Sequence, residues 1–405
     1  MQVMDQIPSV RLSSVSVQRT NILTLSVAEA RRIPQIDGLR AIAILMVFAA
    51  HAFAVPLFWM GVDLFFVLSG FLITGILLRL KEKRADGGSY WSSFYARRVR
   101  RILPPYIVFL LVVTFFFRVQ WAHIWYWYVF FTPNIPLALG KVTVAAMGPL
   151  WSLGVEEQFY FAWPWLVLAC SKAGLRRVAL GIIVISPFLR AIFTPVFSTH
   201  SPIYSLTIFR ADSLAMGAFI ALSARHNPQW IGRQRPKALG GFVLALAVLA
   251  GLSALAGFRA AANSILFNSI GYSLSAVCLG CTLIYVLGLQ KGFLHTLLTA
   301  RPLRYLGLIS YTFYLYHEAV LLKAGQYFHS RMPIALAAFS VTILISVLSW
   351  HLFEAPILGR SAKTLAAGSP SNPGASGPIL WPIGARRAQS KIVVATSPLY
   401  ERHLN

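Results

Sequence analysis

Histidine, carboxyl and clustered arginine side chains are the groups in this sequence whose types and spacing suit proton transfer and anion binding. His51 follows Arg40 in an apolar stretch, with ten residues between them. An imidazole that titrates near neutral pH can take a proton from a hydroxyl group. Four arginines stand in the stretch FYARRVRRILPPY at 94–106. Guanidinium groups bind phosphates bidentately, but a basic run beside an apolar segment can also simply anchor the chain at a membrane, and both interpretations stay open.

Half of the 12 acidic residues lie within or at the edges of apolar segments. A charge at the centre of a membrane helix costs about 2.5–3.5 kcal/mol or more, so each is a candidate functional group. The alternative is an interhelical hydrogen bond or ion pair that only holds the helices together. The residues concerned are Asp63, Glu156, Glu157, Asp212, Glu318 and Glu354.

The composition shows what kind of protein must position these groups. Of the 405 residues, 57% are hydrophobic and only 12% are charged, whereas soluble domains carry about 25% charged residues. The 36 Lys and Arg residues leave a net charge of +24. This combination excludes an ordinary cytosolic enzyme. It also argues against nucleic acid as a partner, because nucleic-acid binders concentrate basic residues on a soluble domain.

Ten segments are apolar enough to be membrane helices of about 20 residues. The stretch 121–139 is rich in Trp and Tyr, which prefer the membrane interface, and it is left out. With the N-terminus in the cytoplasm, 29 of the 36 basic residues then lie on the cytoplasmic side. The positive-inside rule therefore predicts an all-α polytopic membrane protein with about ten transmembrane helices and both termini cytoplasmic, with 121–139 at the outer face or re-entrant. The predicted helices are 39–58, 61–80, 103–119, 152–170, 177–194, 208–225, 238–257, 266–288, 304–324 and 332–353.

Three regions are predicted along the chain. Residues 1–35 form a polar cytoplasmic tail without the apolar core of a signal peptide. Residues 36–358 form the membrane domain, and the low-complexity composition of 359–405 predicts a disordered cytoplasmic tail. Cys278 and Cys281 have C-x-x-C spacing inside an apolar stretch but lack a second pair of ligands, so we expect helix packing there and no metal.

The rise of 1.5 Å per residue predicts the depth of the polar groups. His51 lies roughly 16 Å above the cytoplasmic end of its helix, and His317 and Glu318 lie about 20 Å up theirs. Glu156 enters from the outer face and reaches a similar layer, whereas Asp63 and Asp212 fall nearer the outer edge. Because buried polar groups need partners, this convergence predicts a site in the outer half of the membrane.

Seven sequence blocks, in order, resemble the signature blocks of the acyltransferase family 3 membrane proteins, over about residues 35–360. This family includes O-antigen, exopolysaccharide and Nod-factor O-acetyltransferases and macrolide acyltransferases. The blocks are IDGLRAIAILMVFAAHAF (36–53), GVDLFFVLSGFLIT (61–74), FYARRVRRILPPY (94–106), WSLGVEEQFYFAWP (151–164), RADSLAMGAFIA (210–221), ISYTFYLYHE (309–318) and FEAP (353–356).

The resemblance implies residue roles. The family's arginine–ten residues–histidine pattern falls on Arg40 and His51, and its Arg-x-x-Arg pattern falls on Arg98 and Arg101, although the pair 97 and 100 has the same spacing. In the family the histidine is regarded as catalytic and the arginines as serving the acyl-coenzyme A donor. The family's acidic block matches 156–157. Its common His-x-Pro ending is absent here, which weakens any role for His317.

The resemblance also implies the reaction. We expect acetyl-CoA or another acyl-CoA as a cytoplasmic co-substrate, no bound cofactor, and a hydroxyl acceptor on a glycan, glycolipid or small molecule. The protein would lie among the lipids of the bacterial inner membrane. Some family members carry a fused extracytoplasmic hydrolase-like domain; no such domain is seen here, so the enzyme would work alone or with a separate partner. The main alternative is a transporter or flippase that uses intramembrane carboxylates and histidine as a proton relay.

The supporting residues follow from the expected mechanism. His51 acts as base or as acyl carrier, with Glu156 preferred over Asp63 as the carboxylate that orients its ring. Ser69 is interpreted as a small packing residue, or else as part of the acceptor path. Further candidates for the acceptor path or its support are Asp63, Glu157, Asp212 and His317. Tyr316 is a candidate hydrogen-bond donor to the developing oxyanion.

Overall fold

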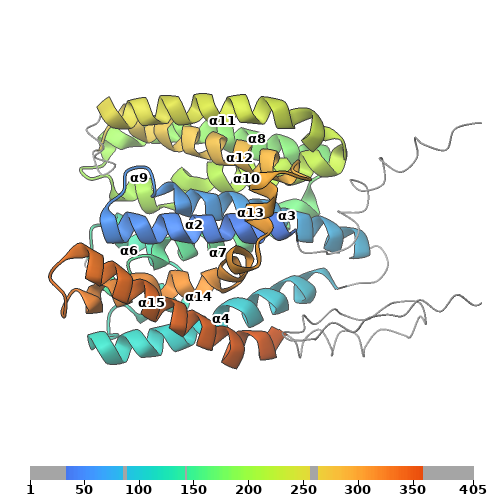
Figure 1. Cartoon of the computed structure of the whole chain (residues 1–405). Helices are drawn as coiled ribbons and strands as arrows, with labels where there is room; N and C mark the ends of the chain where they lie inside the picture. The colour runs from blue at the N-terminus through green and yellow to red at the C-terminus, as the bar shows by residue number, and fades with distance from the viewer. Residues whose placement is uncertain (1–32, 85–88, 142–143, 256–262, 359–405) are drawn as a thin grey trace, which may run out of the picture. The chain divides into compact units, whose positions relative to one another are not determined.

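The computed structural model describes residues 33–84, 89–141, 144–255 and 263–358, and within these ranges the chain forms helices and no strand. The predicted tail 359–405 and residues 1–32 of the predicted N-terminal tail lie outside the described residues. Ten long helices make up the described part of the fold (Figure 1). They are α2 (Pro34–Phe53), α3 (Met60–Arg84), α4 (Tyr90–Phe117), α7 (Leu150–Ala169), α8 (Lys172–Phe193), α10 (Thr207–His226), α11 (Trp230–Leu255), α12 (Tyr272–Leu287), α14 (Arg301–Ala324) and α15 (Arg331–Ser349).

Each of the ten predicted membrane segments overlaps one long helix. Eight helices, counted with their short continuations, are long and apolar enough to cross a membrane, which indicates a multi-pass membrane protein. The two long helices outside this set are α7 and α14, which carry the acidic pair 156–157 and the pair His317–Glu318. The count of ten crossings and the cytoplasmic placement of both termini stay predictions.

Two of the helix boundaries that differ from the prediction bear on the site. α2 ends at Phe53 instead of 58, because Ala54 adopts a left-handed conformation with φ of 54° and its N–H caps the carbonyl of Ala50. α4 begins at Tyr90 instead of 103, and two prolines lie inside it. The arginine run therefore lies on the helix itself and not in a loop before it.

The stretch 121–139 contains two short helices, α5 (Trp125–Val129) and α6 (Asn134–Ala138), of five residues each. Five helical residues span only about 7.5 Å, against a hydrocarbon core of about 30 Å. The prediction that this stretch is not a membrane-crossing helix is confirmed. Asn134 ties α6 to its neighbours, because its side-chain amide donates to the Ser205 carbonyl and accepts from Gln158.

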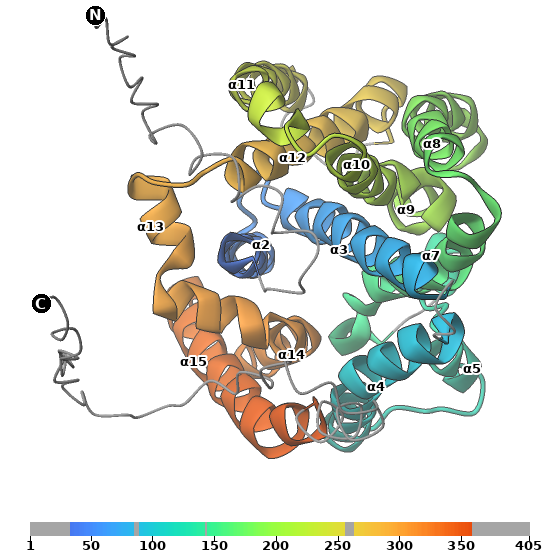
Figure 2. The ribbon, with the colours of Figure 1, turned by 90° about the vertical axis from the view of Figure 1, so that its right-hand side faces the viewer.

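α3 lies at the centre of the described helices and contacts α2, α4, α7, α10 and α12 (Figures 1 and 2). The contact with α10 needs glycine on both helices. A Cβ on Gly70 would collide with the Leu214 carbonyl oxygen, and one on Gly217 would collide with that of Val67. Small residues let helix backbones approach closely in this way.

α14 packs beside α2 and contacts α15 and α4, so α2, α3, α4, α7 and α14 surround a common space. On the far side, α11 packs on α12, where Cys278 is buried and the Cys281 sulfur lies against Gly241. The expectation that these cysteines serve helix packing is confirmed.

Candidate active site

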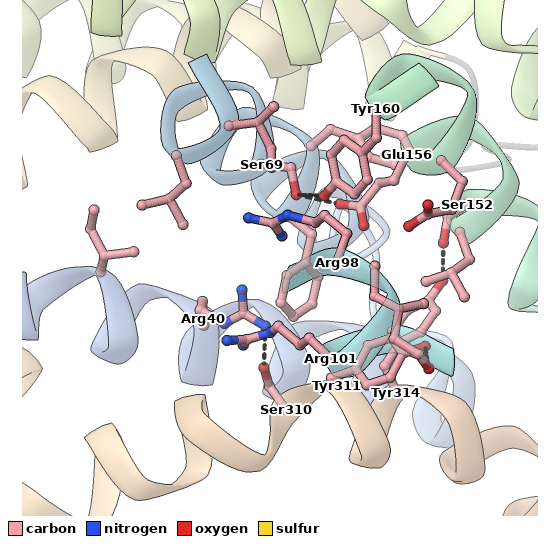
Figure 3. Close-up of a pocket in the computed structure, with 18 of the residues that line it drawn as sticks. Arg40, Ser69, Arg98, Arg101, Ser152, Glu156, Tyr160, Ser310, Tyr311 and Tyr314 are labelled. Carbon is pink, nitrogen blue, oxygen red and sulfur yellow. Dashed lines mark hydrogen bonds between the residues drawn. The ribbon is translucent and has the colours of Figure 1, made fainter. Parts of the chain in front are cut away.

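An elongated cavity of about 310 Å³ lies between α2, α3, α4, α7 and α14 (Figure 3). On α3 its lining runs from Ile76 to Val62, a length of about 21 Å along the helix. Isoleucine, leucine and phenylalanine side chains supply much of the wall. The charged residues that line the cavity are Asp37, Arg40, Arg98, Arg101, Glu156 and Glu157.

Three arginines from two helices face this cavity. Arg40 is held by α14, because its Nε donates to the Gly307 carbonyl at 3.3 Å and its Nη2 donates to Ser310 Oγ at 3.1 Å. Arg98 lies over the ring of Tyr160, with 5.4 Å from its guanidinium carbon to the ring centroid. Arg101 lies one turn farther along α4 and also lines the cavity. The contacts of Arg40 and Arg98 orient their guanidinium groups toward the cavity before any ligand binds.

The structure separates the two Arg-x-x-Arg registers of α4. Arg98 and Arg101 are partly buried and line the cavity. Arg97 and Arg100 are exposed and are not among the lining residues. The 100° rotation per helical residue places the second pair on another face. The geometry therefore favours the register 98 and 101 for a ligand-binding role.

Glu156 belongs to the arginine cavity and not to His51, which corrects the predicted pairing. Its carboxylate accepts a hydrogen bond of 2.6 Å from Ser69 Oγ, which in turn accepts one of 2.9 Å from the Tyr160 hydroxyl. Ser69 thus lines the cavity instead of only filling space between helices. Oε1 of Glu157 is buried without a hydrogen-bond partner among the described residues.

His51 lies near the end of α2, outside the set of cavity-lining residues. Its Nδ1 is 2.8 Å from the Val47 carbonyl oxygen, and its Nε2 is 4.0 Å from Glu318 Oε2. The ring of His317 stands edge-on to it at 5.0 Å between centroids. The predicted convergence of His51, His317 and Glu318 is confirmed, and Glu318 is the carboxylate beside His51.

Tyr314 stands between the cavity and the histidine pair. It lines the cavity, and its ring centroid is 5.4 Å from that of His317. Its hydroxyl lies 2.5 Å from Ser152 Oγ and 2.9 Å from the Pro149 carbonyl oxygen. Arg40 and His51, eleven residues apart on one helix, are about 16 Å apart along its axis. A ligand held by the arginines must extend that far, past Tyr314, to reach the imidazole.

Tyr316, predicted as an oxyanion donor, faces a different way. It packs edge-on against Phe109 at 5.1 Å inside an apolar cluster and is not among the cavity-lining residues. Tyr311 and Tyr314 line the cavity instead. The helical spacing could have indicated that Tyr314, and not Tyr316, lies beside His317. Residues three or four apart share a face of a helix, and Tyr314 stands three residues before His317, whereas Tyr316 does not stand at that spacing.

Asp63 and Asp212 lie outside the site, which corrects their assignment as acceptor-path residues. Asp63 pairs with Arg210 and accepts a hydrogen bond of 2.8 Å from Ser275. Asp212 pairs with Arg190 at 2.7 Å. All four ionic side chains are at most 1% exposed, and none lines the cavity. The alternative interpretation, an ion pair that holds the helices together, is right for both.

Comparison with known proteins shows the family to which the chain belongs. The sequence model of a family described as "Acyltransferase domain" matches residues 33–351. The peptidoglycan O-acetyltransferase OatA of Listeria monocytogenes is 29% identical over 362 residues, which make up 80% of this chain and 56% of that protein. The putative peptidoglycan O-acetyltransferase YrhL of Bacillus subtilis is 30% identical over 379 residues, 83% of this chain and 56% of that protein. A putative O-acetyltransferase of Staphylococcus aureus is 28% identical over 371 residues, 83% of this chain and 59% of that protein.

The chain thus spans between 56% and 59% of the length of these relatives. No solved structure matches it. The family match does not favour the transporter alternative. Because the family model covers residues 33–351, most of the chain, the protein belongs to acyltransferase family 3, a family of enzymes that transfer acyl groups other than aminoacyl groups.

Proposed function

We propose that this protein is a membrane O-acetyltransferase that takes an acetyl group from acetyl-CoA, or a related acyl group from its CoA ester, and delivers it to a hydroxyl group of a cell-surface glycan. The observation that carries the proposal is the convergence of Arg40, Arg98 and Arg101 on one elongated cavity. Its lining includes Tyr314, whose ring lies next to the His51–His317 pair.

The donor fits the cavity by charge and by shape. Guanidinium groups bind phosphate oxygens through charge-assisted hydrogen bonds, and three of them are placed along the same cavity. The apolar wall formed by residues such as Phe65, Leu72 and Ile73 suits the thin chain that links the CoA phosphates to the thioester. The phosphates would sit at the arginines, and the acyl end would point toward Tyr314.

His51 is suited to the chemical step because its tautomer is set by the backbone. The Val47 carbonyl can only accept, so Nδ1 carries the hydrogen and Nε2 presents a lone pair. In a direct transfer, Nε2 takes the proton of the acceptor hydroxyl as its oxygen attacks the thioester carbonyl, the carbon–sulfur bond breaks, and the proton passes to the departing thiolate. In the acyl-carrier route, Nε2 itself attacks the carbonyl, the carbon–sulfur bond breaks and CoA leaves as its thiolate. The acceptor hydroxyl then attacks the acetyl group on the ring, the bond from the acetyl carbon to Nε2 breaks, and the proton of the hydroxyl passes to the thiolate.

Either route requires Tyr314 to move, because its ring lies between the cavity and the histidines.

The acceptor would approach from the opposite side, where the His51 side chain is 37% exposed. The relatives named for peptidoglycan O-acetylation favour a polysaccharide acceptor of that kind. The location we propose is the bacterial cytoplasmic membrane, with the donor entering from the cytoplasm.

The test uses purified protein and acetyl-CoA labelled in the acetyl group, with and without a glycan extract. We expect labelled glycan and released CoA, and His51→Ala should lower the rate by about 10²–10⁴-fold, the usual contribution of a general base. Membrane insertion and yield should stay normal. Protein-bound label in the absence of acceptor would identify the acyl-carrier route. Near-normal transfer by His51→Ala would contradict the assignment.

A further inference from the structure

His51, His317 and Glu318 form a second feature that acyl transfer alone does not explain. One ligand atom of each lies within 4.8 Å of those of the other two, in the part of the chain that the structure describes. His317 is fully buried, and neither its Nε2 nor Oε2 of Glu318 has a hydrogen-bond partner there. A buried ring nitrogen without a partner costs free energy unless something binds it.

Both imidazoles are oriented in the same way. Nδ1 of His51 lies 2.8 Å from the Val47 carbonyl oxygen, and Nδ1 of His317 lies 2.7 Å from that of Tyr314. Because a carbonyl oxygen only accepts, each Nδ1 must carry its hydrogen, and each Nε2 is left as a lone-pair donor. Metal-binding histidines are typically held in this way, with the other ring N–H donated to a carbonyl.

We infer that these three side chains form a binding site for a divalent cation of the zinc type. Two imidazole nitrogens and one carboxylate oxygen with an open fourth position are a known zinc ligand set. The half-exposed His51 leaves a route from the solvent. Zinc bonds of about 2.0–2.2 Å place tetrahedral ligands roughly 3.4 Å apart. The site therefore closes by about an ångström on binding, through rotation of the partly exposed His51 and Glu318.

The ion would compete with the proposed reaction, and this consequence rests on the proposed function. A zinc ion bound to Nε2 of His51 uses the lone pair that takes the proton or attacks the thioester. Zinc on the outer side of the membrane would therefore inhibit acyl transfer reversibly. The sequence predicts no metal site in this chain, and this inference departs from that expectation, because it uses side chains that the fold brings together.

Zinc binding is measured directly on the full purified chain, stripped with a chelator and titrated with ZnCl₂ in competition with a chromophoric chelator. We expect one ion per chain. Glu318→Gln, which keeps the side-chain volume, and His317→Ala should each weaken binding at least tenfold, because changes even outside the ligand shell cost 10–100-fold. His329→Ala, a histidine outside the cluster, should bind as the wild type does. No stoichiometric zinc, or equal affinity in Glu318→Gln, would overturn the inference.

The inhibition is measured separately with the acetyl-transfer assay. Zinc should abolish transfer in the wild type, a chelator should restore it, and Glu318→Gln should need at least tenfold more zinc. Full activity of the zinc-loaded wild type would contradict the competition. Zinc binding by a protein that shows no acetyl transfer under any condition would leave the metal site intact and contradict the proposed function instead.

Discussion

Two sets of charged residues lie inside this protein, and they differ in what surrounds them. The first set, Arg40, Arg98, Arg101 and the adjacent carboxylates, lines a cavity of about 310 Å³. The second set joins α3, α8, α10 and α12 through the pairs Asp63–Arg210 and Asp212–Arg190. Serine hydroxyls and backbone carbonyls add hydrogen bonds to the second set, although Nε of Arg190 and Nε and Nη1 of Arg210 have no hydrogen-bond partner among the described residues. None of these four ionic side chains lines the cavity of the first set.

This difference shows how an intramembrane charge is to be interpreted. A charge that meets an opposite charge from a neighbouring helix holds the helices together, and a charge that faces an open space is available to a ligand. Changes in the second set, the closed set, should therefore lower stability. Changes in the first set, the open set, or in other side chains that line its cavity should instead alter binding or rate. The following predictions test this division, beginning with the largest expected effect.

Asp63→Asn should cost about 3–5 kcal/mol of stability, because it leaves the buried Arg210 without its counter-charge. Thermal unfolding in detergent, together with the yield of folded protein, measures the loss. The double variant Asp63→Asn/Arg210→Gln is the control, and it should be less destabilised than the two single changes added together. A stable Asp63→Asn protein with impaired donor binding would move Asp63 into the open set.

Ser152→Ala should have a smaller effect than Asp63→Asn, and it should change the rate of acetyl transfer instead of the stability. It removes one of the two hydrogen bonds that hold the Tyr314 hydroxyl, a contribution of about 0.5–1.5 kcal/mol. If Tyr314 must swing away for the acyl group to pass, kcat should rise roughly two- to tenfold while KM for acetyl-CoA stays unchanged. Tyr314→Phe, which loses both hydrogen bonds, should behave in the same direction. A raised KM in Ser152→Ala would instead show that Ser152 binds the donor.

Glu82→Gln should have the smallest effect. Glu82 pairs with Lys172 and Arg225 at the end of α3, and its side chain is 43% exposed. Exposed ion pairs contribute about 0–1 kcal/mol, so unfolding and acetyl transfer should both remain close to those of the wild type. A loss as large as that of Asp63→Asn would show that burial is not what distinguishes the closed set.

Local sequence patterns predicted the helices well and the site in part. Apolar length identified all ten long helices, and the family resemblance indicated Arg40, Arg98 and Arg101 as ligand-binding candidates, all of which line the cavity. The partner of His51 was predicted wrongly. The rise per residue gives the depth of a side chain in the membrane but not the direction in which it points from its helix. Glu156 and Glu318 lie at similar depths, so depth alone could not decide which of them lies beside His51. Likewise, the sequence could not show which groups Arg190 and Arg210 contact. Some of these groups are distant in the sequence, and only helix packing brings them close to the arginines.

Direct binding of acetyl-CoA tests most sharply whether the arginine-lined cavity holds the donor. Two arginines of α4 provide a matched pair, because Arg98 lines the cavity and Arg100 is exposed outside it. Calorimetric titration of the purified protein should show that Arg98→Ala weakens acetyl-CoA binding roughly tenfold to hundredfold, the effect of losing a charge-assisted phosphate contact, while Arg100→Ala binds as the wild type does. Equal affinities of the two variants for acetyl-CoA would contradict the assignment of this cavity as the donor site.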